Sequence, residues 1–251
     1  MARKHRDVMR LLTADIVSGV RPAGEMLPRE VDLAAEFDVS RGVARETIRA
    51  MEERGLISVR HGIGATVNGP EHWDVFDVDV LAATLDSDQG AEVLTQYLEC
   101  RRILEVEAAG LAAERAGKGQ IEELGRALEQ MEESTRRAAN SAAEDLFHKA
   151  DIAFHQALIA ATGNRPLARL VERIHSALLV ARYPLARPEY RQQRALPEHR
   201  KIFQAVSSGD PSKARKAMSD HLDTIGSYLA EYGRKKGGKA ADGTARSKTS
   251  V

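Results

Sequence analysis

The stretch LAAEFDVSRGVARETIRAM, residues 33–51, constrains the fold more than any other part of the sequence. Its first residues are apolar at helical spacing, Asp38 and Val39 interrupt the pattern, and Ser40 opens a second run. The apolar positions of the second run are Val43, Ala44, Thr47, Ile48 and Met51. The pattern predicts two short helices joined by a tight turn, which is the helix-turn-helix arrangement.

The polar face of the second predicted helix carries three arginines. Arg41, Arg45 and Arg49 are successive i,i+4 neighbours, so their guanidinium groups project along one side of the helix. Ser40 is placed to cap the start of this helix, and a helix N-terminus is itself an anion site. In a helix-turn-helix protein the second helix enters the major groove, where arginine binds phosphate or the edge of guanine. A solvated charged face on an ordinary helical hairpin is the alternative interpretation.

A short β-hairpin is predicted directly after this helix. Gly55 ends the helix, and the sequence ISVRHGIGATV then indicates strands at residues 57–60 and 65–67, joined by the glycine-rich turn HGIG. A two-stranded wing in this position predicts a winged helix-turn-helix. His61 and Gly62 lie at the tip of the wing, where they would reach toward an adjacent groove.

Five segments between residues 24 and 67, in the order GEMLPRE, LAAEF, VSRGVARETI, GLI and RHGIGATV, resemble the DNA-binding domain of GntR-family bacterial repressors. The resemblance covers nearly all of that domain and implies that Arg41, Arg45 and the wing contact operator DNA. The sequence departs from the family pattern at Val31, where some members carry a DNA-contacting arginine, and at Gly42, which replaces a threonine-like residue. The residues expected at the DNA surface are Ser40, Arg41, Gly42, Arg45, Arg49, His61 and Gly62.

Charge and cysteine content narrow the class of protein only in part. The 251 residues contain 37 Lys and Arg and 37 Asp and Glu, so the formal net charge is zero. Residues 1–69 carry eleven basic and ten acidic side chains, so the case for DNA binding depends on local placement rather than on bulk charge. Cys100 is the only cysteine, which favours a reducing compartment, and no apolar run is long enough for a membrane span. A cytoplasmic protein is expected.

The predicted fold class is mostly α, with an N-terminal winged helix-turn-helix domain and a C-terminal antiparallel helical bundle. Residues 1–69 are expected to bind DNA, with a first helix at residues 7–18, and residues 70–79 to form a linker that Trp73 and Phe76 dock onto one of the domains. Residues 80–232 are expected to bind an effector and to dimerise, and residues 233–251 to form a disordered basic tail. The expected helices beyond the wing are residues 78–85, 91–116, 121–139, 142–161, 165–183, 190–207 and 211–232.

Four residues of the bundle form a candidate metal site. Asp151 and His155 are i,i+4 neighbours on one helix. His199 and His221 lie on consecutive helices at similar distances from the turn SSGDP, so they are level in an antiparallel hairpin. One carboxylate and three imidazoles suit a divalent metal with positions left for a ligand or water. The alternative is that each histidine is a partly buried side chain satisfied by its own neighbour; His148 and His175, which lack such a pattern, are expected to be surface or packing residues.

A second resemblance covers the bundle. The segments LECRRILEVEAAGLAA, DIAFHQALIAATGN, EHRKIFQAV and AMSDH, between residues 98 and 221, are similar to the FCD ligand domain of the subgroup named after the fatty-acid-responsive regulator. It implies that Asp151 and the three histidines bind a divalent metal, zinc or nickel being the leading candidates. It further implies that Arg101 holds a carboxylate effector, with Asn164 as a second candidate contact. Members that bind acyl-coenzyme A lack the metal histidines, so their presence here points to a small acid.

The sequence therefore predicts a ligand-responsive transcription factor, not an enzyme. As a repressor, it would bind a palindromic operator as a homodimer and sense a small organic or sugar acid through the metal. The alternative from another class is a metal-dependent enzyme that carries a nucleic-acid-binding module. The sequence contains no HExxH motif, no phosphate-binding glycine loop and no paired general acid and base beside the metal ligands. A constitutive DNA-binding protein with a purely structural bundle is a third possibility, in which the metal ligands have no use.

Overall fold

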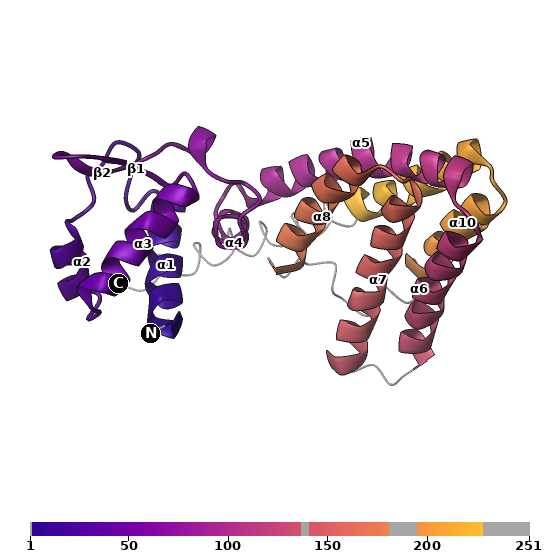
Figure 1. The fold of residues 1–251 in the computed structure, drawn as a ribbon, viewed down its shortest axis with the longest axis horizontal. Coiled ribbons are helices and arrows are strands. Elements are labelled where there is room, and N and C mark those ends of the chain that lie inside the picture. The colour runs from indigo at the N-terminus through magenta and orange to yellow at the C-terminus, as the bar shows by residue number, and fades with distance from the viewer. Residues whose placement is uncertain (1, 137–140, 181–194, 228–251) are drawn as a thin grey trace, which may run out of the picture. The chain divides into compact units, whose positions relative to one another are not determined.

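Helices account for most of the chain, as the apolar spacing predicts. The structure is a computed structural model that describes residues 2–136, 141–180 and 195–227 (Figure 1). The chain forms two compact units, the first made mainly of residues 1–93 and the second mainly of residues 94–227. Within the described residues no helix is long and apolar enough to cross a membrane. The predicted tail at residues 233–251 and the segment 181–194 lie outside the described residues.

The first unit is a winged helix-turn-helix. Helix α1 (Ala2–Val17) packs against α3 (Arg41–Glu53), and α2 (Glu30–Glu36) precedes α3 across the turn. Asp38 lies in this turn with a φ of 50°, a left-handed conformation that Asp tolerates better than most residues. The unit encloses one buried apolar cluster, whose members include Val8, Leu12, Ile16, Leu33, Ala44, Ile48, Met51, Leu56, Ile57 and Val67. The predicted helical pair is confirmed.

Helix α3 begins where the sequence predicts. The side chain of Ser40 accepts a hydrogen bond from the backbone N–H of Val43, 3.3 Å away, and so caps the helix. The apolar positions Ala44, Ile48 and Met51 are buried, which leaves the opposite face exposed. The cap and the buried stripe together fix which side chains of α3 face solvent.

The wing is a two-stranded antiparallel sheet of β1 (Ile57–Arg60) and β2 (Gly64–Val67). Ile57 pairs with Val67 at its base and Arg60 with Gly64 at its tip. Ile57 and Val67 are buried in the cluster of the first unit, so the register anchors the base of the wing and leaves its tip in solvent. The predicted hairpin is confirmed, with β2 starting one residue earlier than expected.

The backbone at Gly55, between α3 and the wing, lies very close to the backbone at His72. Gly55 has a φ of 71°, and a Cβ at this position would lie 1.9 Å from the carbonyl oxygen of His72. The short helix η1 (Pro70–His72) leads to Trp73, which packs on the cluster of the first unit as the linker prediction anticipated. Helix α4 (Val78–Asp86) packs against α1 and contributes Val80 to the same cluster. It thus groups with the first unit, although the sequence analysis assigned residues from 80 onward to the second domain.

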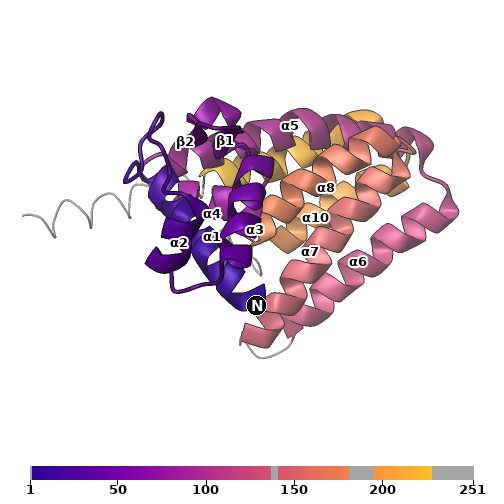
Figure 2. The ribbon, with the colours of Figure 1, turned by 60° about the vertical axis from the view of Figure 1, so that its left-hand side comes forward.

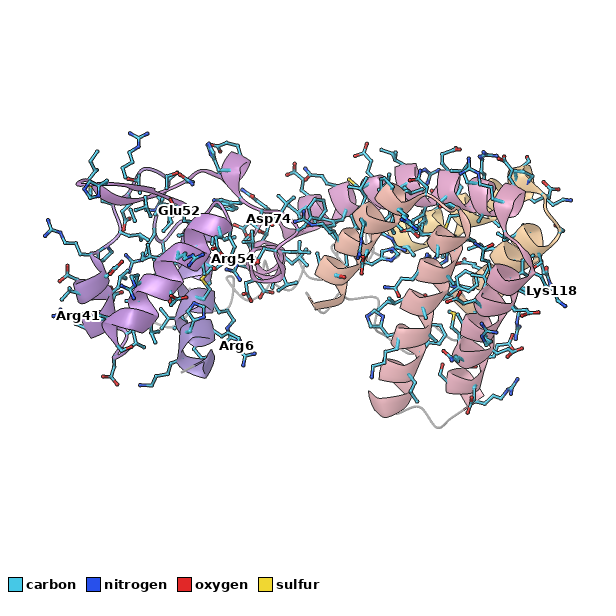
Figure 3. The ribbon with its side chains drawn as sticks, viewed as in Figure 1. Arg6, Arg41, Glu52, Arg54, Asp74 and Lys118 are labelled. Carbon is cyan, nitrogen blue, oxygen red and sulfur yellow. The ribbon has the colours of Figure 1, made fainter. Side chains whose placement is uncertain are left out.

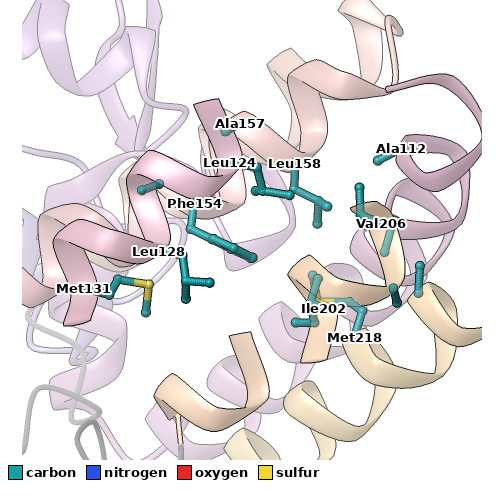
Figure 4. Close-up of a cluster of buried hydrophobic side chains, with 14 of the residues drawn as sticks. Ala112, Leu124, Leu128, Met131, Phe154, Ala157, Leu158, Ile202, Val206 and Met218 are labelled. Carbon is teal, nitrogen blue, oxygen red and sulfur yellow. The ribbon is translucent and has the colours of Figure 1, made fainter. Parts of the chain in front are cut away.

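The second unit is a helical bundle in which α6 and α7 run side by side (Figures 1 and 2). Its core gathers apolar side chains from α5, α6, α7, α10 and residues 211–227, with the fully buried Phe154 among them (Figure 4). Burying a side chain of this size contributes about 1.5 to 3 kcal/mol. The helices are α5 (Gly90–Arg115), α6 (Lys118–Arg136), α7 (Ser141–Ala161), α8 (Arg165–Val180), α10 (Leu196–Ser207) and the helical residues 211–227.

Candidate metal centre and DNA-binding surface

Three buried histidines from separate helices meet in the second unit. His155 comes from α7, His199 from α10 and His221 from residues 211–227, and none is more than 2% exposed. One ring nitrogen from each lies within 4.8 Å of the others. The Nε2 atoms of His155 and His199 are 3.3 Å apart, and Oδ1 of Asp151 lies 3.2 Å from Nε2 of His199. The structure therefore brings together the four side chains that the sequence analysis grouped.

The other ring nitrogen of each histidine lies no more than 2.9 Å from a protein oxygen. Nδ1 of His199 donates to the carbonyl oxygen of Ala195 at 2.7 Å, and Nδ1 of His221 donates to Oε2 of Glu198 at 2.9 Å. Nδ1 of His155 lies 2.7 Å from Oε2 of Glu105, close but off the best hydrogen-bond direction. We assign the proton to Nδ1 in all three rings from these contacts. Fixing one ring nitrogen in this way is how proteins orient histidines that ligate a metal through the other.

With that assignment, the Nε2 atoms present lone pairs to a common centre. No proton then lies between the Nε2 atoms of His155 and His199, which are 3.3 Å apart, and the Asp151 carboxylate adds a further acceptor. Nε2 of His221 is buried and has no hydrogen-bond partner in the described part of the chain. Buried acceptors that face one another are unfavourable unless a donor or a cation lies among them. The donor set of three imidazoles and one carboxylate fits a divalent metal ion.

The charge states of these groups suit metal binding. Burial lowers the pKa of His155 from its ordinary value of 6.5 to about 4, despite the opposing effect of the nearby Glu105 carboxylate. Burial also lowers the pKa of His221, and the neighbouring His199 adds to that effect. Burial raises the pKa of Asp151, but a protonated His199, which would donate from Nε2 to this carboxylate, outweighs burial and holds the pKa well below its usual range; a divalent ion would take the place of that proton. Neutral imidazoles and an ionised carboxylate are the forms that ligate metals.

Glu105 forms a second buried cluster next to the first. Its carboxylate is fully buried and contacts three side chains: Nε of Arg101 at 2.6 Å, Nε2 of His175 at 2.9 Å and Nδ1 of His155 at 2.7 Å. Burial raises the pKa of Glu105, but Arg101, His175 and His155 outweigh it and hold the pKa well below its usual range. Glu105, His155 and His175 are close enough to hold a metal ion, but a cation there would lie beside the Arg101 guanidinium. The triad of His155, His199 and His221 is therefore the better metal site.

Sequence reasoning missed part of this arrangement. His175 was expected to be a surface or packing residue, whereas it is buried and bound to Glu105. Glu105 and Glu198 were not considered, although Glu105 stands four residues after Arg101 and Glu198 directly precedes His199. The i,i+4 spacing of Arg101 and Glu105 was the signal that could have found the first of them.

The two candidate effector contacts have different surroundings. Arg101 is buried in the second unit, with its guanidinium held by Glu105. Asn164 is exposed, and its Oδ1 accepts from the backbone N–H of Leu167 at 3.2 Å, which caps the start of α8. Arg101 thus lies beside the metal candidate, whereas the side chain of Asn164 already serves a structural purpose.

The side chains expected at the DNA surface are exposed on the first unit. Arg41 lies at the start of α3 and points into solvent (Figure 3), and Gly42, Arg45 and Arg49 are also exposed. Nε of Arg49 contacts Oε1 of Glu53 at 3.1 Å, so its charge is partly compensated within the helix. The wing-tip residues are exposed as well, with Gly62 in a left-handed conformation at a φ of 77°. The exposed start of α3 and the wing tip suit a nucleic-acid interface.

These features, a winged helix-turn-helix followed by a helical bundle with a buried histidine cluster, are those of a DNA-binding protein with a second, helical domain. Residues 4–67 match the sequence family described as bacterial regulatory proteins, gntR family, and residues 96–224 match the FCD domain family. The chain belongs to the GntR family and carries an FCD domain.

Its relatives are transcriptional regulators. The chain is 30% identical over 224 residues to the HTH-type transcriptional regulator LutR of Bacillus subtilis (strain 168), a match that covers 86% of this chain and 97% of LutR. It is 30% identical over 207 residues to the galactonate operon transcriptional repressor of Escherichia coli (strain K12), covering 82% and 88% of the two chains. These relatives are regulators rather than enzymes, which excludes the alternative of a metal-dependent enzyme.

A solved structure supports the fold assignment. The structure described as "Lar controls the expression of the Listeria monocytogenes agr system and mediates virulence" is similar with a TM-score of 0.62 at 23% identity. The similarity covers 89% of this chain and 96% of the other. The predicted fold class, mostly α with an N-terminal winged helix-turn-helix and a C-terminal helical FCD domain, is confirmed.

Proposed function

We propose that this regulator is a repressor that senses a small carboxylic acid through a divalent metal held by Asp151, His155, His199 and His221. The observation that carries the proposal is the convergence of three buried Nε2 atoms, one of them without a hydrogen-bond partner among the described residues. A divalent ion gives these acceptors a common partner. Such an ion, when bound, supplies a positive centre with coordination positions left for an anion.

The chemical class of the effector follows from the groups around this centre. Glu105 contacts both the Arg101 guanidinium and His155, so the guanidinium lies near the site. Guanidinium groups bind carboxylates with paired hydrogen bonds. A metal and an arginine together favour a ligand with a carboxylate and a neighbouring oxygen, such as a hydroxy acid or a sugar acid. One relative is the galactonate operon transcriptional repressor of Escherichia coli, and galactonate is a sugar acid. Imidazole-rich donor sets suit zinc and nickel, which are the metals to test first.

For DNA binding, we propose that α3 enters the major groove and that the wing tip reaches an adjacent groove. Ser40, Arg41 and Gly42 stand at the exposed start of α3, Arg45 and Arg49 follow on the same face, and His61 and Gly62 form the wing tip. Because a single winged unit offers few base contacts, a homodimer that binds a palindromic operator is expected. The first unit then binds DNA, and the second binds the effector and provides the dimer contacts.

The test begins with protein purified without chelator. Elemental analysis is expected to find about one divalent ion per chain, and a chelator is expected to lower the melting temperature because ligands from three helices lose their common partner. His221→Ala should lose the ion, whereas His148→Ala, which changes another histidine of the same bundle, should retain it. Protein with no metal, or with metal that His221→Ala leaves unchanged, would refute the proposed site.

The effector is tested with a palindromic duplex selected from a random pool. Galactonate, gluconate and smaller hydroxy acids are added in turn, and release of the duplex is followed by fluorescence anisotropy. Wild-type protein should respond to at least one acid, and His221→Ala should bind the duplex but fail to respond, because the DNA-binding surface lies in the other unit. An equal response from both proteins would show that acid sensing does not require the metal.

A further inference from the structure

Glu105 is the residue at which the two buried clusters of the second unit meet. Its side chain is 0% exposed and is reached from three helices. Oε1 accepts from Nε of Arg101, on the same helix, and contacts Nε2 of His175 on α8 at 2.9 Å. Oε2 lies 2.7 Å from Nδ1 of His155 on α7 and 3.4 Å from Nη2 of Arg101. One carboxylate therefore touches the candidate effector arginine and a candidate metal ligand at the same time.

The contact to His155 decides which ring nitrogen points at the metal centre. Oε2 of Glu105 lies 2.7 Å from Nδ1, although off the best hydrogen-bond direction. Its negative charge favours the proton on Nδ1, which leaves the lone pair of Nε2 facing His199, 3.3 Å away. Without an acceptor at Nδ1, the proton could move to Nε2, where it would occupy the lone pair that a metal needs. Glu198 has the equivalent place beside His221, but the described contacts of its carboxylate are to His221 and Thr224 and include no arginine. Glu105 and Glu198 thus each lie beside a histidine of the site, but only Glu105 contacts Arg101 among the described contacts.

The contact to Arg101 is compatible with ligand binding. A guanidinium has five N–H donors, and Glu105 engages the Nε side of the group. An acid that binds through Nη1 does not need to break this contact. It would draw part of the guanidinium charge toward itself and weaken the pairing with Glu105. The carboxylate would then accept more strongly from Nδ1 of His155, which raises the basicity of Nε2.

We infer that Glu105 is a positioning residue that couples the two halves of the effector site, the arginine and the metal, through its two carboxylate oxygens. His175 is the third donor, and it helps to keep this buried carboxylate ionised and fixed in place. The inference rests on the proposed function, because it assigns Glu105 a role in that same site. Its consequence is that the acid strengthens metal binding, and by linkage the metal strengthens acid binding by the same factor.

The first test uses metal-free protein and compares Glu105→Gln with Glu198→Gln. Long-range ¹⁵N–¹H correlation spectra of histidine-labelled protein report which nitrogen of each ring carries the proton. In wild type the His155 proton is expected on Nδ1. Glu105→Gln should shift that proton toward Nε2 and leave His221 unchanged, and Glu198→Gln should do the reverse. A His155 signal that Glu105→Gln does not alter would overturn the positioning role, whether or not the protein binds metal.

The second test measures zinc affinity by competition with a chromophoric chelator, with and without the acid that releases DNA from wild type. We expect Glu105→Gln and Glu198→Gln each to weaken zinc binding by about 10- to 100-fold, as substitutions of the groups that orient metal ligands do. The acid can also ligate the zinc directly, and that contribution is common to both variants. Only Glu105→Gln should therefore reduce the effect of the acid on zinc affinity below its size in Glu198→Gln. Equal acid effects in the two variants would refute the coupling. Should Glu105→Gln not fold, Glu105→Asp keeps the charge beside Arg101 but shortens the side chain, and it is expected to show the same reduction.

Wild-type behaviour separates this inference from the proposed function. Wild-type protein that takes up no zinc would refute the metal-based function, and the proton position on His155 would still decide whether Glu105 orients that ring. Wild-type protein that binds zinc and acid independently would leave the metal site standing but refute acid sensing through the metal as well as the coupling. Equal acid effects in Glu105→Gln and Glu198→Gln, with a normal response in wild type, would refute the coupling alone.

Discussion

Acidification of the metal-free protein should destabilise it before any carboxylate titrates. The pKa of His155 is 6.5 in an exposed setting and about 4 in the folded chain, because burial disfavours the charged ring. Between these two values the unfolded chain binds a proton at His155 that the folded chain does not, so the free energy of unfolding falls as the pH falls. Stability from this residue is therefore fully present above pH 6.5 and is lost as the pH approaches about 4.

The size of the effect follows from the difference between the two pKa values. At about 1.36 kcal/mol for each pH unit, the whole interval corresponds to about 3 kcal/mol, of which about 2 kcal/mol falls between pH 7 and pH 5. His221 adds a contribution of the same sign because its pKa is also lowered. The pKa values of Asp151 and Glu105 are likewise lowered, but these carboxyls lose their contributions only below their ordinary values of 3.8 and 4.5. The interval from pH 7 to pH 5 thus isolates the histidines.

Urea denaturation of chelator-treated protein, followed by circular dichroism at pH 7, 6 and 5, measures the effect. His155→Gln removes the titrating ring and should reduce the fall in stability by about 2 kcal/mol over this range. His61→Gln changes an exposed histidine of the wing and should leave the fall unchanged. Equal slopes for wild type and His155→Gln would show that burial does not lower the pKa of His155, and the charge argument for the metal centre would fail with it.

Three further outcomes are expected. Arg45→Ala should lose about 1 to 3 kcal/mol of operator affinity in a fixed-salt titration while its melting curve stays that of wild type, because the side chain is exposed; unchanged affinity would remove Arg45 from the DNA surface. Gly55→Ala should lower the melting temperature more than Gly19→Ala does. Both glycines have φ near 75°, but a Cβ at Gly55 would meet a backbone oxygen, whereas a Cβ at Gly19 has nothing within 4 Å in the described chain. Equal losses would argue against the close approach at Gly55. Light scattering should report a dimer at micromolar concentration, and a stable monomer in the presence of operator would contradict the palindromic site.

The local elements of the fold could be predicted because local rules determine them. Helix α3 follows from the apolar spacing and the Ser40 cap, and the wing from alternation around the glycine-rich turn. The unit to which α4 belongs could not be predicted, because Val80 and its neighbours show that the helix has an apolar face but not which unit that face packs on. Its packing against α1 depends on long-range contacts that periodicity does not encode.

The same distinction applies to the candidate site. Asp151 with His155, and His199 with His221, could be grouped because helical spacing and an antiparallel hairpin relate residues by simple geometry. His175 could not be found in this way, since its partner Glu105 lies 70 residues away on a helix whose rotation about its own axis the sequence does not reveal. The buried carboxylate is the part of the site that only the three-dimensional structure supplies.

The position of the histidines within the bundle has a consequence for the protein's evolution. The ring of Phe154 lies edge-on to His199 with centroids 4.9 Å apart, so the polar cluster is inserted directly into the apolar core. Replacing buried polar groups with apolar side chains of similar volume is often neutral or stabilises a protein by about 1 to 4 kcal/mol. A descendant that exchanged the three buried histidines together with the carboxylates that contact them, Asp151, Glu105 and Glu198, for apolar side chains would thus fold at least as well and would still present α3 to DNA. Exchanging the histidines one at a time would instead leave Glu105 or Asp151 without a present partner, and breaking a buried ion pair destabilises a protein. The cluster can therefore persist in a lineage that no longer uses it, because each single step away from it lowers stability.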